Sequence, residues 1–418
     1  MLTFNEWKNY DGTYFDEILT EAEDKNTHST HIEDLIFTKK KKGVEKALGG
    51  LLYIKKKIGS SKAQTTDITV KIDGAPAIFS GTINGKFFVA TKGLFAKTPK
   101  INFTNEDIDK NHSGELAEKL KLALKYLKDV IPEGKIFQGD FLFDYTTLKT
   151  QSIDGIDYYT WHPNTIKYAV EKDTPLGKKI GSSKFGIIFH TEYTSDGVDP
   201  TSIRLKGFGV KESDLKKSKD VWTTDAFHKN LGNIIAFTAE EIRKIDNITK
   251  DIQSKLSSIN WNVLNDNTIP LIMTFTNTYI RNNIAQPNHK VKSEEFISYV
   301  NSKAKYDIDS KKSEKGKVTA ENKWKPVLDI INTSNSKTFE SLFYVHSLLY
   351  ELKIMMFKKL DSIKSTKTFL EKADGTLEVT GQEGFVLTTT SASGTKLVDR
   401  YQFSLANFSP DFKKGWSH

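Results

Sequence analysis

The spacing of hydrophobic residues changes along the chain and predicts helices in some parts and strands in others. Over residues 41–57 the apolar side chains recur at helical spacing, with lysines at both ends, which predicts an amphipathic helix. A polar loop is expected at 59–67. From 68 to 93 the pattern has a period of two, and three strands broken by glycine turns are expected there. The dipeptide Asn84-Gly85 is a strong signal for a hairpin between two of those strands.

The remaining pattern separates a sheet-rich region from a helical one. Another amphipathic helix is expected at 114–130, and strands are expected at 135–144 and 184–193. The pattern then becomes helical, and strand character returns over 376–404. In the helical region we expect helices at 225–258, 268–284, 293–305 and 337–364, and a polar, charge-dense, mobile loop at 307–323.

These patterns predict an α+β chain in which a sheet-rich domain is interrupted by a helical block and then resumes. We expect the last strands to complete the first sheet, so that the block is an insertion and not a second domain in series. The predicted division has an N-terminal arm and helix at 1–64, the first part of the sheet-rich domain at 65–205, the helical insertion at 206–370 and the last strands at 371–418.

Composition narrows the possible functions. The chain has 61 Lys and Arg against 53 Asp and Glu, a net charge of +8, and a basic balance favours polyanionic partners such as nucleic acid. An AT-rich genome also encodes many lysines, so the charge alone leaves both explanations open. The only arginines are Arg204, Arg243, Arg281 and Arg400. The absence of cysteine excludes disulfides, thiolate zinc sites, iron–sulfur clusters and a cysteine nucleophile.

The sequence contains no candidate membrane span, which would need about 20 uninterrupted apolar residues. Its longest apolar stretch, 342–357, is interrupted by His346, Glu351 and Lys353. The N-terminal residues lack the basic start and the apolar core of a signal peptide. These features predict a soluble cytoplasmic protein.

The segment with the clearest chemical content is Lys71-Ile72-Asp73-Gly74, at the end of a predicted strand. A lysine acts as a nucleophile only after losing its proton. Because its ordinary pKa is about 10.4, its surroundings must lower that pKa. Asp73 is expected on the same face of the strand, where it can orient the amine or hold a ribose hydroxyl. Gly74 lets the backbone turn against a ligand. The alternative is a strand end with an ordinary turn.

The residues around Lys71, KIDGAPA, resemble motif I of the covalent nucleotidyltransferases, the superfamily of ATP-dependent DNA ligases, RNA ligases and mRNA capping enzymes. Segments similar to the later motifs follow in the same order. They supply Lys92 and Gly93, 21 positions after Lys71; Asp140 in FQGDFLFD, similar to motif III; Phe189, with Tyr193 second, in FGIIFHTEY, similar to motif IIIa; Glu383 and Gly384 in QEGFVL, similar to motif IV; and Lys396 in TKLVDR, similar to motif V. The resemblance covers 65–193 and 376–404 and is closest to phage RNA-ligase-like proteins.

This resemblance implies a nucleotidyltransferase (ATP-grasp-like ligase) domain of antiparallel sheets and helices, and an ATP-dependent polynucleotide ligase. In such enzymes the lysine that matches Lys71 attacks the α-phosphate of ATP, releases pyrophosphate and carries AMP. The AMP passes to a 5′-phosphate end, and a 3′-hydroxyl then displaces it to join the strands. The resemblance implies catalytic roles for Lys71, Asp73 and Lys396.

The same resemblance implies a nucleotide site. Its residues would be Lys71, Asp73, Gly74, Lys92, Asp140, Phe189, Glu383 and Lys396. Lys92 and Lys396 would supply positive charge to the phosphates and help keep Lys71 neutral. Asp140 and Glu383 are carboxylates suited to Mg²⁺, or Mn²⁺, and Phe189 offers a face for adenine. The plainer alternatives are a turn residue for Glu383, a core side chain for Phe189 and solvated lysines for Lys92 and Lys396.

The chain departs from the superfamily at three points. Many members have an arginine five positions after the nucleophile, where this chain has Pro76. Many have a second lysine two positions after the one that matches Lys396, where Val398 stands, with Arg400 the nearest cation. Only 18 residues follow Arg400, so no C-terminal OB-fold of the kind found in DNA ligases is expected, which favours RNA over DNA as the substrate.

Two other functions remain open at this point. One is a DNA ligase or a capping-type guanylyltransferase, because the sequence does not fix the base. The other is a catalytically decayed phage protein that binds nucleic acid. The stretch HIEDLIF, from His31 to Phe37, also resembles one found in uncharacterised tailed-phage proteins, for which the expected compartment is the host cytoplasm. The oligomeric state is left open, with a monomer assumed.

Overall fold

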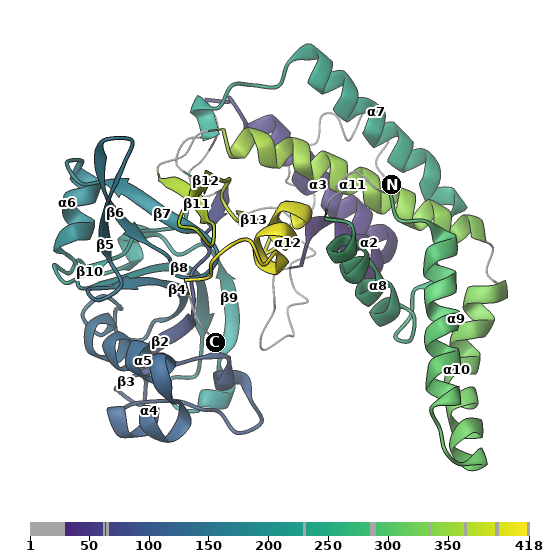
Figure 1. Ribbon diagram of the computed structural model, residues 1–418, viewed down its shortest axis with the longest axis horizontal. Coiled ribbons are helices and arrows are strands. Elements are labelled where there is room, and N and C mark those ends of the chain that lie inside the picture. Colours follow the sequence, from purple (N-terminus) through teal and green to yellow (C-terminus); the bar gives the residue numbers. More distant parts are fainter. Residues whose placement is uncertain are drawn as a thin grey trace.

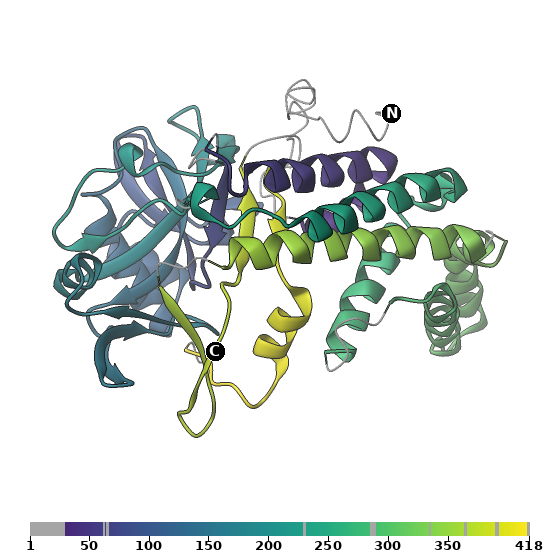
Figure 2. The same ribbon diagram turned by 90° about the horizontal axis from the view of Figure 1, so that it is seen from above.

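The computed structural model describes residues 30–415 except 62, 64–66, 229–230, 285–289, 334–335, 363–365 and 389–392. A sheet-rich half and a helix-rich half lie side by side in both ribbon views (Figures 1 and 2). The described strands pair antiparallel with one exception, and helices pack beside the sheets. The α+β class predicted from the sequence is therefore confirmed.

The largest sheet has the strand order β10-β8-β4-β2-β3, with β9 paired to β8. Its members are β2 (Ala77–Ile83), β3 (Lys86–Ala90), β4 (Ile136–Asp144), β8 (Phe185–Thr194), β9 (Arg204–Phe208) and β10 (Val221–Trp222). Helix α5 (Gly114–Leu127) covers one face, where Leu120 and Ala123 pack against Phe137 and Phe189. The other face packs partly against Leu94 of the segment after β3, through Phe79 and Phe88. The strands and the helix predicted between 76 and 193 are confirmed here.

A three-stranded sheet joins segments from opposite ends of the chain. It consists of β1 (Ile68–Lys71), β13 (Gly384–Leu387) and β14 (Lys396–Leu397), in that order. The register places Ile68 opposite Leu387 and Lys71 opposite Gly384. The late strands therefore return to the early part of the chain, as predicted, but they pair with β1 alone, in a sheet separate from that of β2 and β3.

A five-stranded sheet completes the sheet-rich half and is mostly absent from the sequence prediction. Its order is β12-β11-β7-β6-β5. Its members are β5 (Lys149–Ile153), β6 (Ile156–Trp161), β7 (Lys167–Glu171), β11 (Lys367–Glu371) and β12 (Leu377–Val379). β12 lies within the strand region expected at 376–404, but β5 is largely exposed, so it lacks the alternation of apolar residues that marks a half-buried strand.

The helix-rich half shares one hydrophobic core, in which Ile36, Leu48, Ile252 and Leu349 are buried together. Helices α3, α7 and α11 run side by side along its length (Figure 2). The helices of this half are η2 (Ile32–Asp34), α2 (Leu35–Thr38), α3 (Lys40–Lys57), α7 (Ala239–Lys255), α8 (Ile269–Asn282), α9 (Ser293–Asp309), α10 (Glu314–Thr333) and α11 (Ser336–Leu360). Residues 30–57 thus pack within the helical core, and the boundaries predicted at 64, 205 and 370 stay predictions.

Two predictions in the helical region are wrong. The helix expected at 225–258 begins only at Ala239, because Thr238 forms a capping box with Glu241 there. The loop expected at 307–323 is instead the end of α9 and the first half of α10. In α10, Ala320, Trp324, Val327 and Ile331 are buried at helical spacing. Charged residues occupy the exposed face of α10, where Glu314 and Lys317 pair at 3.0 Å in its first turn.

The last predicted strand is also corrected in part. Residues 400–408 form helix α12 (Arg400–Phe408) instead of continuing the strand through residue 404. Asp399 caps this helix, because its side chain accepts hydrogen bonds from the backbone N–H groups of Tyr401 and Gln402. In Figure 1, α12 lies between the two halves of the molecule.

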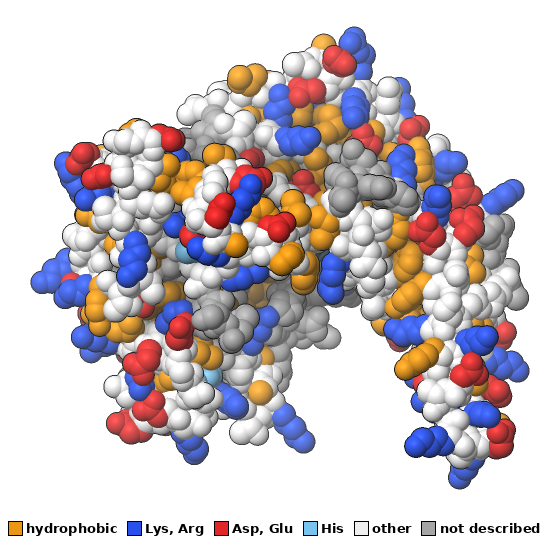
Figure 3. All heavy atoms as spheres, in the orientation of Figure 1, with side chains coloured by type: hydrophobic (Ala, Val, Ile, Leu, Met, Phe, Trp, Pro, Cys, Tyr) orange, Lys and Arg blue, Asp and Glu red, His pale blue; other side chains and the backbone are white. Residues whose placement is uncertain are grey.

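The shorter elements complete the fold. They are η3 (Lys92–Phe95), α4 (Asn105–Asn111), α6 (Pro175–Ser182), η4 (Pro200–Ser202), η5 (Glu212–Asp214), η6 (Leu231–Asn233), η7 (Leu256–Ser258) and η8 (Trp261–Val263). Over the described part of the chain, none of the helices combines the length and apolar character that crossing a membrane requires. Figure 3 shows an open recess between the sheet-rich half and the projecting pair α9–α10.

Candidate active site

A cavity of about 360 Å³ lies between the three-stranded and the six-stranded sheets. We call it the Lys71 cavity. Five residues predicted for the nucleotide site line it, although up to 325 positions separate them in the chain: Lys71, Lys92, Asp140, Glu383 and Lys396. Three cations and two carboxylates thus share one hollow, an arrangement that suits a phosphate group together with a divalent cation.

Strand register explains how these residues meet. Lys71 ends β1 opposite Gly384, the first residue of β13, and Glu383 directly precedes that strand. Val386 of β13 faces Lys396 of β14, so both lysines belong to one small sheet. On the facing sheet, Asp140 pairs across with Ala77. Lys92 begins η3, and the capping side chain of Thr91 accepts a hydrogen bond from the backbone N–H of Gly93.

Lys71 and Glu383 form the central ion pair. The Nζ atom of Lys71 lies 2.5 Å from Oε1 of Glu383. Burial alone would lower the pKa of Lys71, but the carboxylates of Glu383, Asp140 and Asp73 outweigh it and raise that pKa above the ordinary value. Without a bound ligand, the amine is therefore held in its charged form, contrary to the neutral nucleophile that we expected.

Glu383 has the opposite balance. Burial raises its pKa to about 7, although the charge of Lys71 opposes the rise. Its Oε2 atom is buried and forms no hydrogen bond with the described residues. A carboxylate with a pKa near neutrality, in contact with an amine, is suited to take up the proton of that amine. The free oxygen atom would suit a further ligand.

The other charged groups of the cavity are also perturbed or paired. Burial and then the charge of Lys71 lower the pKa of Lys396, which makes its neutral form more accessible than for an exposed lysine. Oδ2 of Asp140 lies 3.4 Å from Nε2 of His190, another side chain that lines the cavity. His190 was not predicted. It lies two residues after Ile188 on β8, which also lines the cavity, but the sequence did not show which face of β8 would do so.

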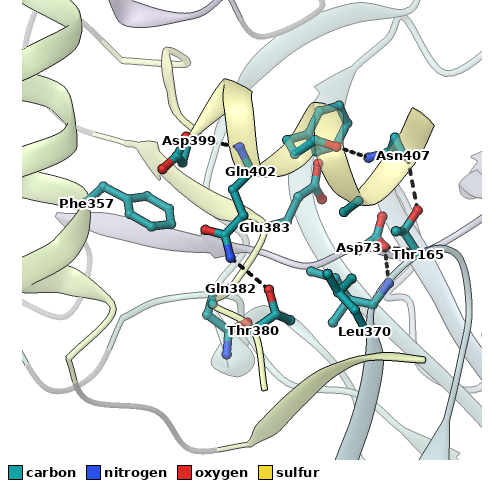
Figure 4. A pocket seen from close by; sticks show the side chains of 14 residues that line it. Asp73, Thr165, Phe357, Leu370, Thr380, Gln382, Glu383, Asp399, Gln402 and Asn407 are labelled. Carbon is teal, nitrogen blue, oxygen red and sulfur yellow. Dashed lines mark hydrogen bonds between the residues drawn. The ribbon is translucent and has the colours of Figure 1, made fainter. Parts of the chain in front are cut away.

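Asp73 is not brought to the Lys71 cavity. Strand β1 ends at Lys71, so the same-face argument used to place Asp73 beside the amine does not apply. Its carboxylate accepts hydrogen bonds of 2.7 Å from the backbone N–H groups of Thr165 and Ile166, and one of 2.8 Å from Asn164. Figure 4 shows Asp73 directed at the segment that carries Thr165. Asp73 therefore anchors this loop to the lysine segment.

Gly74 has a steric explanation. A Cβ atom on Gly74 would lie 2.6 Å from Cβ of Asp140 and 2.7 Å from the carbonyl oxygen of Phe141. Such distances are too short for any side chain, so glycine is required for β4 to approach the Lys71 segment. The structure therefore gives Gly74 a packing role, whereas a direct contact with a ligand was expected.

Phe189 is placed wrongly by the sequence prediction. Its side chain is fully buried on the α5 face of the sheet, where its ring centroid lies 5.8 Å from that of Phe137. It cannot contact a ligand in the Lys71 cavity, and the core alternative is correct. Tyr193, the second choice, does line the cavity, together with Phe208 of β9 and Phe403 of α12. The last two were missed because neither lies in a recognisable motif.

The departures from the superfamily pattern are local. Pro76 follows a cis peptide bond with Ala75, and Val398 is buried with 2% exposure. Arg400 does not replace the missing second lysine, because its guanidinium binds Asp34 at 2.9 Å in the helix-rich half. Among the described residues that line the Lys71 cavity there is no arginine.

Comparisons with known proteins give a family but not a function. The chain belongs to a family described as "Family of unknown function (DUF6267)", whose profile matches residues 26–413. Searches among curated proteins and among solved structures found no match.

Proposed function

We propose that this member of the family is a covalent nucleotidyltransferase that joins polynucleotide ends through a nucleotide attached to Lys71. The observation that carries the proposal is the convergence of Lys71, Lys92, Asp140, Glu383 and Lys396 on one cavity. These are residues to which the resemblance assigns phosphate or metal contacts. They come from three separate stretches of sequence, 71–92, 140 and 383–396. Their meeting in one cavity therefore supports the resemblance.

The first chemical step follows from the Lys71–Glu383 pair. Glu383, with its pKa raised to about 7, accepts a proton from the Lys71 ammonium and leaves a neutral amine. The nitrogen then forms a bond to the α-phosphorus of ATP, while the bond from that phosphorus to the bridging oxygen breaks and pyrophosphate leaves. The second proton of the nitrogen passes to the leaving pyrophosphate, which gives the phosphoramidate. Lys92 and Lys396 stabilise the charge on the phosphates.

The cavity also fits a divalent cation. Asp140 and Glu383 present hard carboxylate oxygens, and Oε2 of Glu383 is buried without a hydrogen bond to the described residues. These are the ligands that Mg²⁺ or Mn²⁺ prefers, usually together with substrate phosphates. Such an ion would neutralise phosphate charge beside Lys71.

Labelling of the protein tests the proposal directly. The protein is incubated with Mg²⁺ and with ATP or GTP labelled at the α-phosphate, and then separated on a denaturing gel. We expect acid-labile label on the wild-type protein with ATP. Lys71→Ala and Lys71→Arg should abolish it, because neither variant has an attacking amine at this position. Lys86→Ala, which removes an exposed lysine of the β2–β3 hairpin, is the matched control and should label normally.

The outcomes separate the alternatives. Label with GTP alone would identify a capping-type enzyme. No label with either nucleotide, or label that survives in Lys71→Ala, would contradict the proposal. Sealing assays on nicked DNA, nicked RNA and single-stranded RNA then determine the polynucleotide, for which we propose RNA first.

A further inference from the structure

A second cavity of about 530 Å³ adjoins the Lys71 cavity. Both are lined by Val70 and Ile72 of the β1 segment, by Ile188 of β8 and by Ala226. We call it the aromatic cavity, because its lining includes Trp161, Tyr168, Trp222, Phe227 and Phe385. The segment that carries Ala226 is fixed against β1, since its carbonyl accepts a hydrogen bond of 2.7 Å from the N–H of Val70.

The two cavities differ in the chemistry that they offer. The Lys71 cavity has three lysines and two carboxylates, whereas five aromatic rings line its neighbour. Three side chains of the aromatic cavity also keep a buried polar atom without a hydrogen bond to the described residues. These atoms are Nε1 of Trp161, Nδ1 of His228 and Oε1 of Gln382. A flat apolar body with polar edges matches such a lining, and a nucleobase has this character.

The position of the aromatic cavity indicates which nucleobase it would hold. Two of its lining residues are sequence neighbours of the central ion pair: Ile72 directly follows Lys71, and Gln382 directly precedes Glu383. A ligand in the aromatic cavity would therefore lie next to that pair. The Lys71 cavity, at about 360 Å³, already has the size of an ordinary small-molecule site and can hold a nucleotide. The first step, with ATP alone, therefore leaves the aromatic cavity without an occupant.

We infer that the aromatic cavity binds the terminal nucleobase of the polynucleotide whose 5′-phosphate receives the nucleotide from Lys71. This inference rests on the proposed function and identifies where that activity would hold its second substrate. The terminal base is the part of the polynucleotide nearest to the reacting phosphate, apart from the sugar. Aromatic side chains can stack on any base. The cavity would therefore favour RNA with a terminal base over abasic RNA, without distinguishing one base from another.

Binding measurements test the inference without requiring catalysis. The probe is a short 5′-phosphorylated single-stranded RNA, compared with the same RNA carrying an abasic terminal nucleotide. We expect wild-type protein to bind the intact RNA about tenfold more tightly, the effect of losing one stacked base. Quenching of tryptophan fluorescence should accompany intact RNA and be weaker with abasic RNA, because Trp161 and Trp222 line the cavity.

A cavity-filling variant locates the effect. Thr224→Trp places a large ring at the wall of the aromatic cavity and should make the two RNAs bind equally, while labelling by ATP is retained. Thr319→Trp, at an exposed position of α10, is the matched control and should keep the tenfold preference. If Thr224→Trp fails to fold, Gln382→Ala, which removes an unpaired polar atom of the lining instead of filling the cavity, should reduce the tenfold preference.

Two results would overturn the inference. Equal affinity of the wild-type protein for intact and abasic RNA would show that the terminal base is not held. Weaker labelling by ATP in a folded Thr224→Trp protein would assign the cavity to the base of ATP instead. Absence of label in the wild-type protein would contradict the proposed function alone, because the RNA comparison measures binding only.

Discussion

Two clusters of charged side chains in this molecule look alike in composition and differ in what they can do. One is the Lys71 cavity. The other, which we call the buried ion cluster, lies in the helix-rich half, where η2 and α12 meet α11, and consists of Glu33, Asp34, His346, Lys353 and Arg400. Both combine acids, bases and a histidine, and in the buried ion cluster three potential ligand atoms lie within 4.8 Å of one another.

The two clusters differ in their balance of positive and negative charge and in their exposure to solvent. In the buried ion cluster, two cations face two carboxylates: Lys353 lies 2.6 Å from Glu33, and Arg400 lies 2.9 Å from Asp34. The side chains of Glu33, Asp34 and Lys353 are at most 2% exposed. In the Lys71 cavity the lysines outnumber the carboxylates, and Lys71 is 29% exposed. In this molecule the ligand-type residues of the Lys71 cavity are therefore the ones that a ligand can reach.

The largest expected effect separates the clusters by stability. Lys353→Met leaves Glu33 buried without its amine and should lower the free energy of unfolding by about 3–5 kcal/mol, measured by urea denaturation. Lys71→Met should cost much less, because Glu383 already has a pKa of about 7 and can become neutral. Lys86→Met is the control on an exposed strand end. Equal losses of unfolding free energy in Lys353→Met and Lys71→Met would contradict this difference between the two clusters.

An intermediate effect concerns the reactivity of the nucleophile. Glu383→Gln removes the carboxylate that contributes most to raising the pKa of Lys71, so that pKa should fall. The measurement is the rate at which an amine-reactive reagent modifies Lys71, followed by peptide mapping over a range of pH. The midpoint should move to lower pH in the variant. Glu192→Gln, which pairs with Lys135 away from the cavity, should leave the Lys71 midpoint unchanged.

A smaller effect is the acid sensitivity of the buried ion cluster. Arg400 and His346 outweigh burial and hold the pKa of Asp34 at about 2, below its ordinary 3.8. A depressed pKa stabilises the folded state above the ordinary value, and this stability is lost as pH falls from about 4 to about 2. The loss should be about 2 kcal/mol. Asp34→Asn should flatten that part of the curve of unfolding free energy against pH, and an unchanged slope would contradict the assignment.

The sequence predicted best those elements whose pattern is local. The alternating residues of β2, β3, β4 and β8 and the apolar faces of α3 and α5 were sufficient to place them. Of the four buried residues of α10 only Ala320 lies within 307–323, so the lysines and glutamates of that segment hid its helical character. The five-stranded sheet pairs β7 with β11, nearly 200 positions later, and no local pattern contains that information.

The candidate site shows the same limit. Lys71, Lys92, Asp140, Glu383 and Lys396 came from motifs with conserved order in a resembling superfamily, and the fold collects them. The sequence does not show which face of β8 lines the cavity. Phe189 and His190 are consecutive, so they lie on opposite faces, and either ring could bind a base. Asp73 was misplaced because the strand ends two residues before it. Orientation at strand ends depends on tertiary contacts that a motif does not carry.

The smallest expected effect is that of a divalent cation on stability. Mn²⁺ at about ten times its dissociation constant should stabilise the wild-type protein by about 1.4 kcal/mol, seen as a rise in the unfolding midpoint. Asp140→Asn should remove this shift, because Asp140 and Glu383 supply the carboxylates open to the cavity. Asp246→Asn, in a partly buried pair with Lys55 outside the Lys71 cavity, is the control and should keep the shift. A shift that survives in Asp140→Asn would move cation binding away from the Lys71 cavity and toward the ligand-type atoms of Glu33, Asp34 and His346, despite the two cations that already balance them.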